Sequence, residues 1–170
     1  MTAFARIDLT GAGSPIHDDH AARRPLLLEG EALHRQLRPT LDADYPAQIE
    51  RMFGEGARLV QLVDKGEVRA IGLWRVFETT YCGRRLEIED LVSSEAHRSR
   101  GYGAAMLRWF DARAVELGCP TTTLHSAVHR DRAHRFYFRE GFHIMGFHFS
   151  RASGARRASD SVSGQAPPGA

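Results

Sequence analysis

Two glycines and two arginines lie where a helix is expected to begin, in the segment HRSRGYGAAML at residues 97–107. A glycine inside a helix costs up to about 1 kcal/mol relative to alanine. Because glycine lacks a Cβ atom, an anion can approach the free N–H groups of a first helical turn, and Arg98 and Arg100 would add positive charge. Gly101 and Gly103 therefore indicate either a phosphate-binding turn or a tight turn with a purely structural purpose. The segment matches neither a Walker loop nor a dinucleotide fingerprint.

Three acidic side chains interrupt an otherwise apolar strand pattern in LEIEDLVSS, residues 86–94. Side chains alternate between the faces of a strand, so Glu87 and Glu89 are expected on one face and Asp90 on the other, unless a bulge intervenes. A carboxylate can take a proton from an ammonium group, which must become neutral before it can act as a nucleophile. The alternative is that these acids are solvated charges on an open sheet face.

The last third of the chain holds further candidates for proton transfer. Tyr137 lies beside Phe136 on an amphipathic helical segment, where an aromatic residue is also ordinary core. Several histidines could each be a base or a ligand, or be no more than hydrogen-bonded side chains. They are His125, His129, His134, His143 and His148. No pair of them has a zinc-site spacing and HDDH at residues 17–20 fits a solvated loop, so no metal is expected.

The elements that must position these residues follow from the spacing of apolar side chains. Strands are expected at residues 5–9, 58–64, 68–78, 86–94, 121–128 and 142–150. Helices are expected at residues 25–39, 42–56, from the glycine turn to Gly118, and at residues 131–141. This order predicts an α/β (α+β) mixed sheet, in which antiparallel strands come first and a strand-helix-strand unit follows.

Length and composition fit an ordinary globular protein. The 170 residues suit one domain, and a net charge of +2 is too small to indicate a nucleic-acid partner. No apolar run approaches the roughly 18 residues of a membrane span, and the N-terminus lacks the apolar core of a signal peptide. Two separated cysteines, Cys82 and Cys119, favour a reducing, cytoplasmic setting. The small, polar tail at residues 152–170 is expected to be disordered.

Two motifs in the second half of the chain occur in a specific order. The first is RSRGYG at residues 98–103, directly after EDLVSSEAH, and the second is AHRFYFREGF at residues 133–142. They resemble the acyl-CoA-binding motif and the Ala-x-x-Phe-Tyr-x-x-x-Gly-Phe signature of the GCN5-related N-acetyltransferase (GNAT) superfamily. The resemblance is strongest over residues 41–150 of a single N-acetyltransferase domain expected at residues 1–151. It implies the family's sheet, splayed at the cofactor site.

This resemblance implies acetyl-CoA as the cosubstrate. The backbone amides of the glycine turn would hold the pyrophosphate, and the strand before the turn would pair with the pantetheine arm. The residues expected to bind the cofactor are Leu91, Val92, Ser93, Arg98, Ser99, Arg100, Gly101, Tyr102, Gly103, Ala104, Arg130, Ala133 and Tyr137. Arg130 stands where the family often has asparagine, so its contact would be charged.

The resemblance also implies roles in transfer to a primary amine by direct attack in a ternary complex. The N–H of Leu91 would stabilise the developing oxyanion of the thioester. Tyr137 would donate a proton to the departing CoA thiolate. Glu89, acting through water, or Glu87 would serve as the base.

The acceptor stays open at this point. Acidic residues near the acceptor would suit a cationic amine, which could be a small molecule, a protein lysine or a protein N-terminus. An acyl-CoA-binding module without catalysis is the alternative function, and an aminoacyl-tRNA acetyltransferase would need a broader basic surface than this chain's charge indicates. Homodimers are frequent in the family, so a homodimer is compatible with the resemblance.

Overall fold

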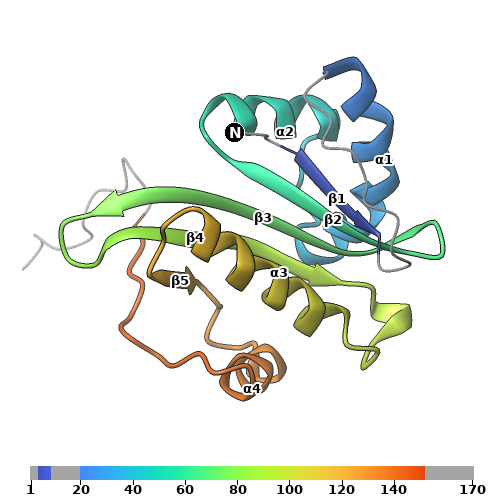
Figure 1. Cartoon of the computed structure of the whole chain (residues 1–170). Helices are drawn as coiled ribbons and strands as arrows, with labels where there is room; N and C mark the ends of the chain where they lie inside the picture. The colour runs from blue at the N-terminus through green and yellow to red at the C-terminus, as the bar shows by residue number, and fades with distance from the viewer. Residues whose placement is uncertain (1–3, 9–19, 152–170) are drawn as a thin grey trace, which may run out of the picture.

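The computed structural model describes residues 4–8 and 20–151, and over these residues five strands form one sheet in the order β1-β2-β3-β4-β5 (Figure 1). The strands are β1 Phe4–Asp8, β2 Arg58–Asp64, β3 Glu67–Thr79, β4 Gly83–Ser93 and β5 Thr121–Leu124. The helices are α1 His20–Leu37, α2 Tyr45–Gly54, α3 Tyr102–Glu116 and α4 Asp131–Arg139, with a 3₁₀ turn at Glu95–His97. The outer strand pairs are parallel and the inner pairs are antiparallel.

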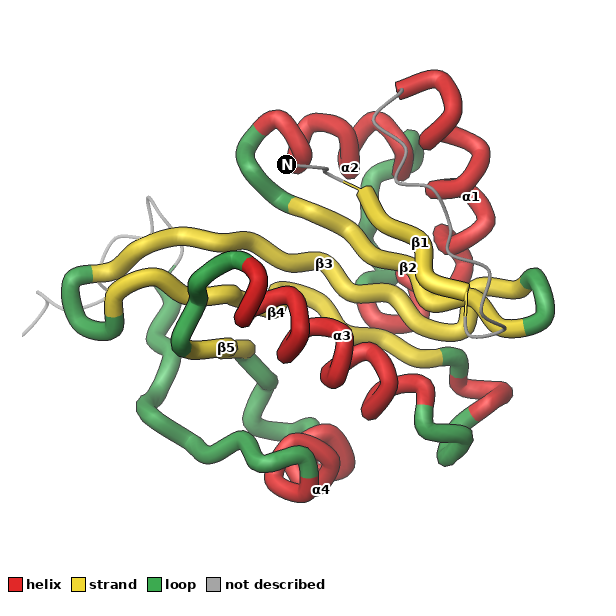
Figure 2. Tube along the Cα trace, in the orientation of Figure 1, coloured by secondary structure: helices red, strands yellow, loops and turns green. Residues whose placement is uncertain are grey.

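Helices cover both faces of the sheet, as Figure 2 shows in the orientation of Figure 1. On one face, α1 and α2 bury an apolar layer that includes Leu27 and Ile49. On the other face, α3 buries Phe110 against Trp74 and Ile88 of the two long strands. Burial of these apolar surfaces is the main favourable term in folding. Strand β4, which carries the acidic residues, is therefore fixed between two packed layers.

A β-bulge interrupts the pairing of β3 with β4. Leu73 pairs with Asp90 and Trp74 pairs with Ile88, so Glu89 is the extra residue of β4. Bulges bend a strand and increase its local twist. The alternation expected for the acids therefore breaks at Glu89, and Asp90 pairs on the face of Leu73, which α1 and α2 cover.

Strands β4 and β5 are paired over only four positions. The register runs from Arg85–Thr121 to Ile88–Leu124, and among the described residues it continues no further. The bulge at Glu89 follows at once on β4, and the chain after Leu124 turns away toward α4. The two strands thus separate at this point, as expected for a sheet that is splayed here.

Two predicted strands differ from the structure. The strand expected at 121–128 ends at Leu124, because β4 bends at its bulge and offers no further partner. The strand expected at 142–150 is wrong, since this segment has no regular structure and Ile144, Phe147 and Phe149 are largely exposed. Alternating apolar residues supply the side-chain pattern of a strand, but a strand also requires a neighbour with which to pair.

Helix boundaries shift by a few residues. Helix α1 begins at His20, before the predicted start, and contains Pro25. Helix α2 runs from Tyr45 to Gly54, inside the predicted range of 42–56, and the left-handed glycine that follows it is Gly56, with a φ of +88°. The predictions for residues 17–19 of HDDH and for the tail at 152–170 lie outside the described residues.

Candidate active site

A cavity of about 1010 Å³ opens where β4 and β5 separate. Ligand sites are typically about 300–1,000 Å³, so this cavity is large enough for an extended molecule. The cavity brings together every residue predicted to bind the cofactor: Leu91, Val92, Ser93, Arg98, Ser99, Arg100, Gly101, Tyr102, Gly103, Ala104, Arg130, Ala133 and Tyr137. Gln36 and Leu37, which sequence reasoning did not select, also line it, as does His129, which was considered only as a base or a ligand.

The glycine turn adopts a backbone that favours anion binding. Gly101 is the N-cap of α3 in the left-handed conformation, with a φ of +83°, and Ser99 has a φ of +63°. A glycine N-cap has no side chain with which to bond the first N–H groups of the helix, so these donors point outward at the positive end of the helix dipole. The turn can therefore hold an anionic group by its backbone.

Gly103 has a different reason to be glycine. A Cβ atom at Gly103 would lie 3.1 Å from Cζ of Phe136, whereas a Cβ atom at Gly101 would meet nothing within 4 Å. Gly103 thus allows α4 to pack closely on the start of α3. This close approach brings the second motif, which contains Tyr137, against the glycine turn.

Positive charge surrounds the cavity. The cationic side chains in its wall are Arg98, Arg100, Arg130, Arg132, Arg135 and Arg139. The acidic residues there are Glu95, which bonds Arg98, and Asp131. A wall of this composition attracts an anionic ligand such as a phosphate ester.

The phenol of Tyr137 lies in this wall among other aromatic rings. Its ring centroid is 5.4 Å from that of Phe136 and 5.8 Å from that of Phe142. Burial raises the pKa of Tyr137, and the charge of Asp90 adds to the rise while Arg130 opposes it. The phenol therefore keeps its proton at neutral pH and is able to donate it.

The backbone of the glycine turn is anchored by its own aromatic residue. The hydroxyl of Tyr102 donates a hydrogen bond to Asp64 at the end of β2, at 2.6 Å. This bond raises the pKa of Tyr102. Tyr102 therefore lies in the cavity wall, and its side chain also ties the turn to the sheet.

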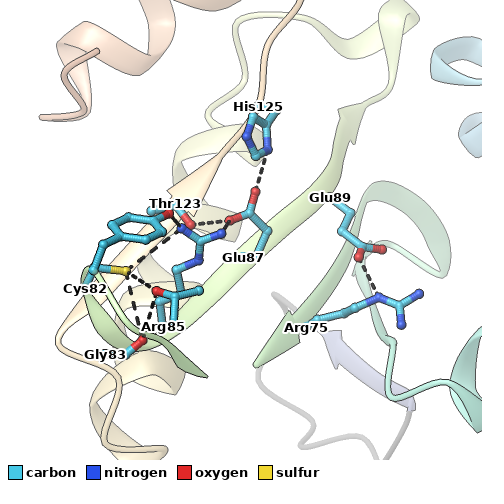
Figure 3. Close-up of polar contacts among 10 residues, drawn as sticks. Arg75, Cys82, Gly83, Arg85, Glu87, Glu89, Thr123 and His125 are labelled. Atoms are coloured by element: carbon cyan, nitrogen blue, oxygen red, sulfur yellow. Dashed lines mark hydrogen bonds and ion pairs between the residues drawn. The ribbon is translucent and has the colours of Figure 1, made fainter. Parts of the chain in front are cut away.

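The two candidate bases lie apart from each other and outside the cavity lining (Figure 3). Glu89 extends toward β3, where Arg75 donates to its Oε1 at 2.5 Å. Glu87 extends toward β5, where Thr123 donates a hydrogen bond to it and His125 lies 2.6 Å away. The acids are thus held by specific partners rather than left free as solvated charges.

Asp90 belongs to a buried network that sequence reasoning missed. Nε2 of His34 lies 3.0 Å from its Oδ2, Nδ1 of the same histidine lies 3.0 Å from the Tyr45 hydroxyl, and Arg38 bonds the other carboxylate oxygen. Burial alone would raise the pKa of Asp90, but the hydrogen bonds from His34 and Arg38 outweigh it and lower the pKa. The signal in the sequence was a histidine on the apolar face of the first helix. The network ties α1 to the residue before Leu91.

Within residues 4–8 and 20–151, no three His, Cys, Asp or Glu side chains come together as a metal site would require. None of the helices described there is long and apolar enough to cross a membrane.

A mixed sheet that splits beside a glycine turn and a helix N-terminus offers a backbone anion site in the split. The profile of the acetyltransferase (GNAT) family matches residues 28–142. The chain therefore belongs to the GNAT family, and it is an N-acetyltransferase of that family. The predicted family and the predicted mixed α/β fold are both confirmed.

Two curated relatives are similar in sequence. An uncharacterised N-acetyltransferase of Bacillus subtilis (strain 168) is 30% identical over 141 residues, covering 80% of this chain and 98% of that protein. The aminoalkylphosphonate N-acetyltransferase of Salmonella typhimurium is 36% identical over 66 residues, covering 39% of this chain and 43% of that protein. The second match thus spans less than half the length of that relative.

Solved structures share the fold at low sequence identity. An aminoglycoside N-acetyltransferase in complex with CoA superposes with a TM-score of 0.67 at 15% identity, covering 76% of this chain and 90% of that one. A ribosomal-protein-alanine N-acetyltransferase from Brucella melitensis superposes with a TM-score of 0.64 at 12% identity, covering 74% and 92%. At these identities the likeness establishes the fold alone.

Proposed function

We propose that this chain transfers the acetyl group of acetyl-CoA to a primary amine by direct attack in a ternary complex. One observation carries the proposal: the cavity at the strand split unites a backbone anion site, a cationic wall and a partly buried phenol. An anion site alone would fit many phosphate ligands. The phenol beside it supplies a proton donor, which thioester chemistry requires when the thiolate leaves.

Acetyl-CoA fits the residues of the cavity by their chemistry. The amides of residues 98–104 would receive the pyrophosphate, with Arg98 and Arg100 adding charge. Leu91, Val92 and Ser93 would present their backbone to the pantetheine arm. Arg130 and Ala133 would flank the arm from the start of α4, where the charge of Arg130 suits a phosphate.

The transfer itself needs a donor to the carbonyl oxygen, an acid for sulfur and a base for nitrogen. The N–H of Leu91 would stabilise the negative charge that develops on the thioester oxygen. Tyr137 would protonate the thiolate as the C–S bond breaks, a role supported by its raised pKa. One carboxylate of β4, Glu89 or Glu87, would assist removal of the amine proton through water or an intervening side chain.

The acceptor class is less constrained by charge than the sequence suggested. Glu87, Glu89 and Asp90 each have an arginine partner, namely Arg85, Arg75 and Arg38. The acids therefore do not form a free anionic surface that would select a cationic amine. We include amines with an anionic group among the candidate acceptors, because one relative is named for aminoalkylphosphonates.

The test is a screen for thiol release from acetyl-CoA with five acceptors: 2-aminoethylphosphonate, spermidine, an aminoglycoside, a lysine peptide and a peptide with N-terminal alanine. Turnover with at least one acceptor is expected. Silence with all five, with CoA binding intact, would overturn the proposal in favour of an acyl-CoA-binding module without catalysis.

A Tyr137→Phe variant tests the acid. It should lower kcat by about 10²-fold, because one proton donor is lost, while the Kd for CoA changes by less than about twofold. Tyr81→Phe is the matched control, since Tyr81 is exposed on the β3–β4 turn and should leave both values unchanged. Equal kcat values for Tyr137→Phe and the parent enzyme would remove Tyr137 from the mechanism.

A further inference from the structure

A histidine stands at the closed end of the strand split. Ile88 and Leu124 are the last paired residues of β4 and β5, so His125 is the first residue beyond the pairing. Leu86 and Ile88 belong to the core under α3, so Glu87 between them points to the opposite face of the sheet. Thr123 and His125 contact Glu87 and lie on that same face (Figure 3).

Glu87 and His125 differ sharply in exposure. The side chain of Glu87 is 7% exposed and that of His125 is 58% exposed. A buried carboxylate cannot reach an incoming amine, whereas the imidazole beside it can. Glu87 Oε1 lies 2.6 Å from His125 Nδ1, and within the described part of the chain this oxygen has no well-aligned hydrogen bond of its own. The carboxylate is therefore free to orient the imidazole.

Other groups contact this pair on the second oxygen of Glu87 and on the ring of His125. Thr123 donates to Oε2 of Glu87, and Arg85 lies 3.4 Å from the same oxygen, so both bind the side of the carboxylate that faces away from His125. His148, from the segment after α4, packs its ring at 4.5 Å from that of His125, nearly edge to face. The two rings are in contact as aromatic rings, with an interplanar angle of 61°.

We propose that His125 is the general base for the acceptor amine and that Glu87 is its positioning residue. The pair rests on the acetyltransferase function proposed above. Nδ1 of His125, at 2.6 Å from Oε1 of Glu87, is the nitrogen that carries the proton in this pairing, so Nε2 carries the lone pair. CoA would fill the cavity from the side of α3 and α4, so the acceptor approaches from the opposite face, which is the face of His125.

The proton balance of the reaction is complete with this assignment. Nε2 of His125 takes one proton from R–NH₃⁺, and the freed lone pair forms the N–C bond to the thioester carbon. The C–S bond breaks, and its electron pair stays on sulfur, which takes the proton of Tyr137. The nitrogen's second proton passes through water to the Tyr137 oxygen, and His125 returns its proton to solvent.

The test compares variants in the purified full chain by kcat/KM against pH, using whichever of the five acceptors turns over. His125→Gln should lower kcat/KM at neutral pH by about 10²-fold, with the KM for acetyl-CoA unchanged. The deficit should shrink as pH rises, because the amine then loses its proton without help. Glu87→Gln should lower kcat/KM less, because the amide still contacts the imidazole, and its deficit should also shrink as pH rises.

His143→Gln is the matched control, because His143 is exposed on the segment after α4 and lies outside both the cavity lining and this pair. Parent-like kcat/KM and an unchanged acidic limb in His125→Gln would overturn the inference while leaving the acetyltransferase proposal standing. A deficit that is equal at all pH values would also overturn it, since a structural defect does not depend on the amine's protonation. A parent enzyme that is inactive with every acceptor would instead refute the proposed function.

Discussion

The two glycines of the turn at the start of α3 serve different purposes, although they are two residues apart. Gly101 supplies a left-handed backbone in open space, and Gly103 supplies room for the Phe136 ring. From the sequence motif, both glycines are expected to make room for an anion. Only the contacts in the folded chain show that the two positions have different roles. The distinction leads to different expectations for alanine at each position.

Gly101→Ala should lower the free energy of unfolding by about 1–2 kcal/mol, because an L-residue is strained at this φ. Gly103→Ala should change it by less than about 1 kcal/mol, since alanine's better helix propensity offsets the displacement of Phe136. Urea unfolding measures both, and Gly54→Ala, with open space around it and ordinary helical φ, is the neutral control. Equal losses at Gly101 and Gly103 would contradict this division of roles.

At the scale of elements, sequence reasoning succeeded where one segment carries its own signal. The strand at 58–64 was predicted with the observed bounds, because apolar residues and the following turn mark it locally. The last strand at 142–150 failed, since pairing depends on a neighbour that the segment's own residues do not specify. The predicted alternation of the acidic side chains allowed for a bulge. Its position at Glu89 could not be predicted, because it depends on the register between β3 and β4.

The candidate site divides in the same way. The cofactor side rests on two motifs whose backbone conformation is local, and its residues come together in one cavity. The partners of the acids are distant in sequence: Arg75 lies 14 residues from Glu89, and His34 lies 56 residues from Asp90. Contacts of this kind depend on how distant elements pack together, so the spacing of residues in the sequence does not predict them.

The packing of α3 on the sheet depends on a glycine in β3. A Cβ atom at Gly72 would lie 2.5 Å from Cζ of Phe110 and 3.2 Å from Cγ1 of Val60. Gly72→Val should therefore overpack this layer and lower the free energy of unfolding by about 2 kcal/mol, measured by urea denaturation. Gly146→Val is the control, because a side chain there meets open space. An unchanged midpoint for Gly72→Val would show that α3 can shift without cost.

At the scale of the whole molecule, the network of His34, Arg38 and Asp90 joins the N-terminal helix to the strand that enters the active site. Asp90 is nearly buried, at 8% side-chain exposure, so its charge depends on the hydrogen bonds from His34 and Arg38. Removing one member of a buried ion pair leaves the others without compensation. The stability of the fold should therefore depend on the ionisation of this one carboxyl.

The sign of that dependence follows from the lowered pKa of Asp90. In the unfolded chain an aspartate titrates near pH 3.9, so above about pH 4 the network contributes fully to stability. As the pH falls toward the lower pKa of the folded state, the unfolded chain binds the proton first, and this contribution is lost. The parent protein should thus lose stability below about pH 4.

Asp90→Asn tests this expectation, because it removes the titrating group while keeping its shape. The free energy of unfolding at pH 7 should fall by about 3 kcal/mol, and the variant's slope below pH 4 should be shallower than the parent's. Asp42→Asn is the matched control: Asp42 also pairs with an arginine, Arg51, but both side chains are about half exposed, so solvent screens the pair and the parent's slope should persist. Parallel acid-unfolding curves for Asp90→Asn and the parent would show that the tie between α1 and β4 is apolar packing alone, and that the charge of Asp90 is incidental to it.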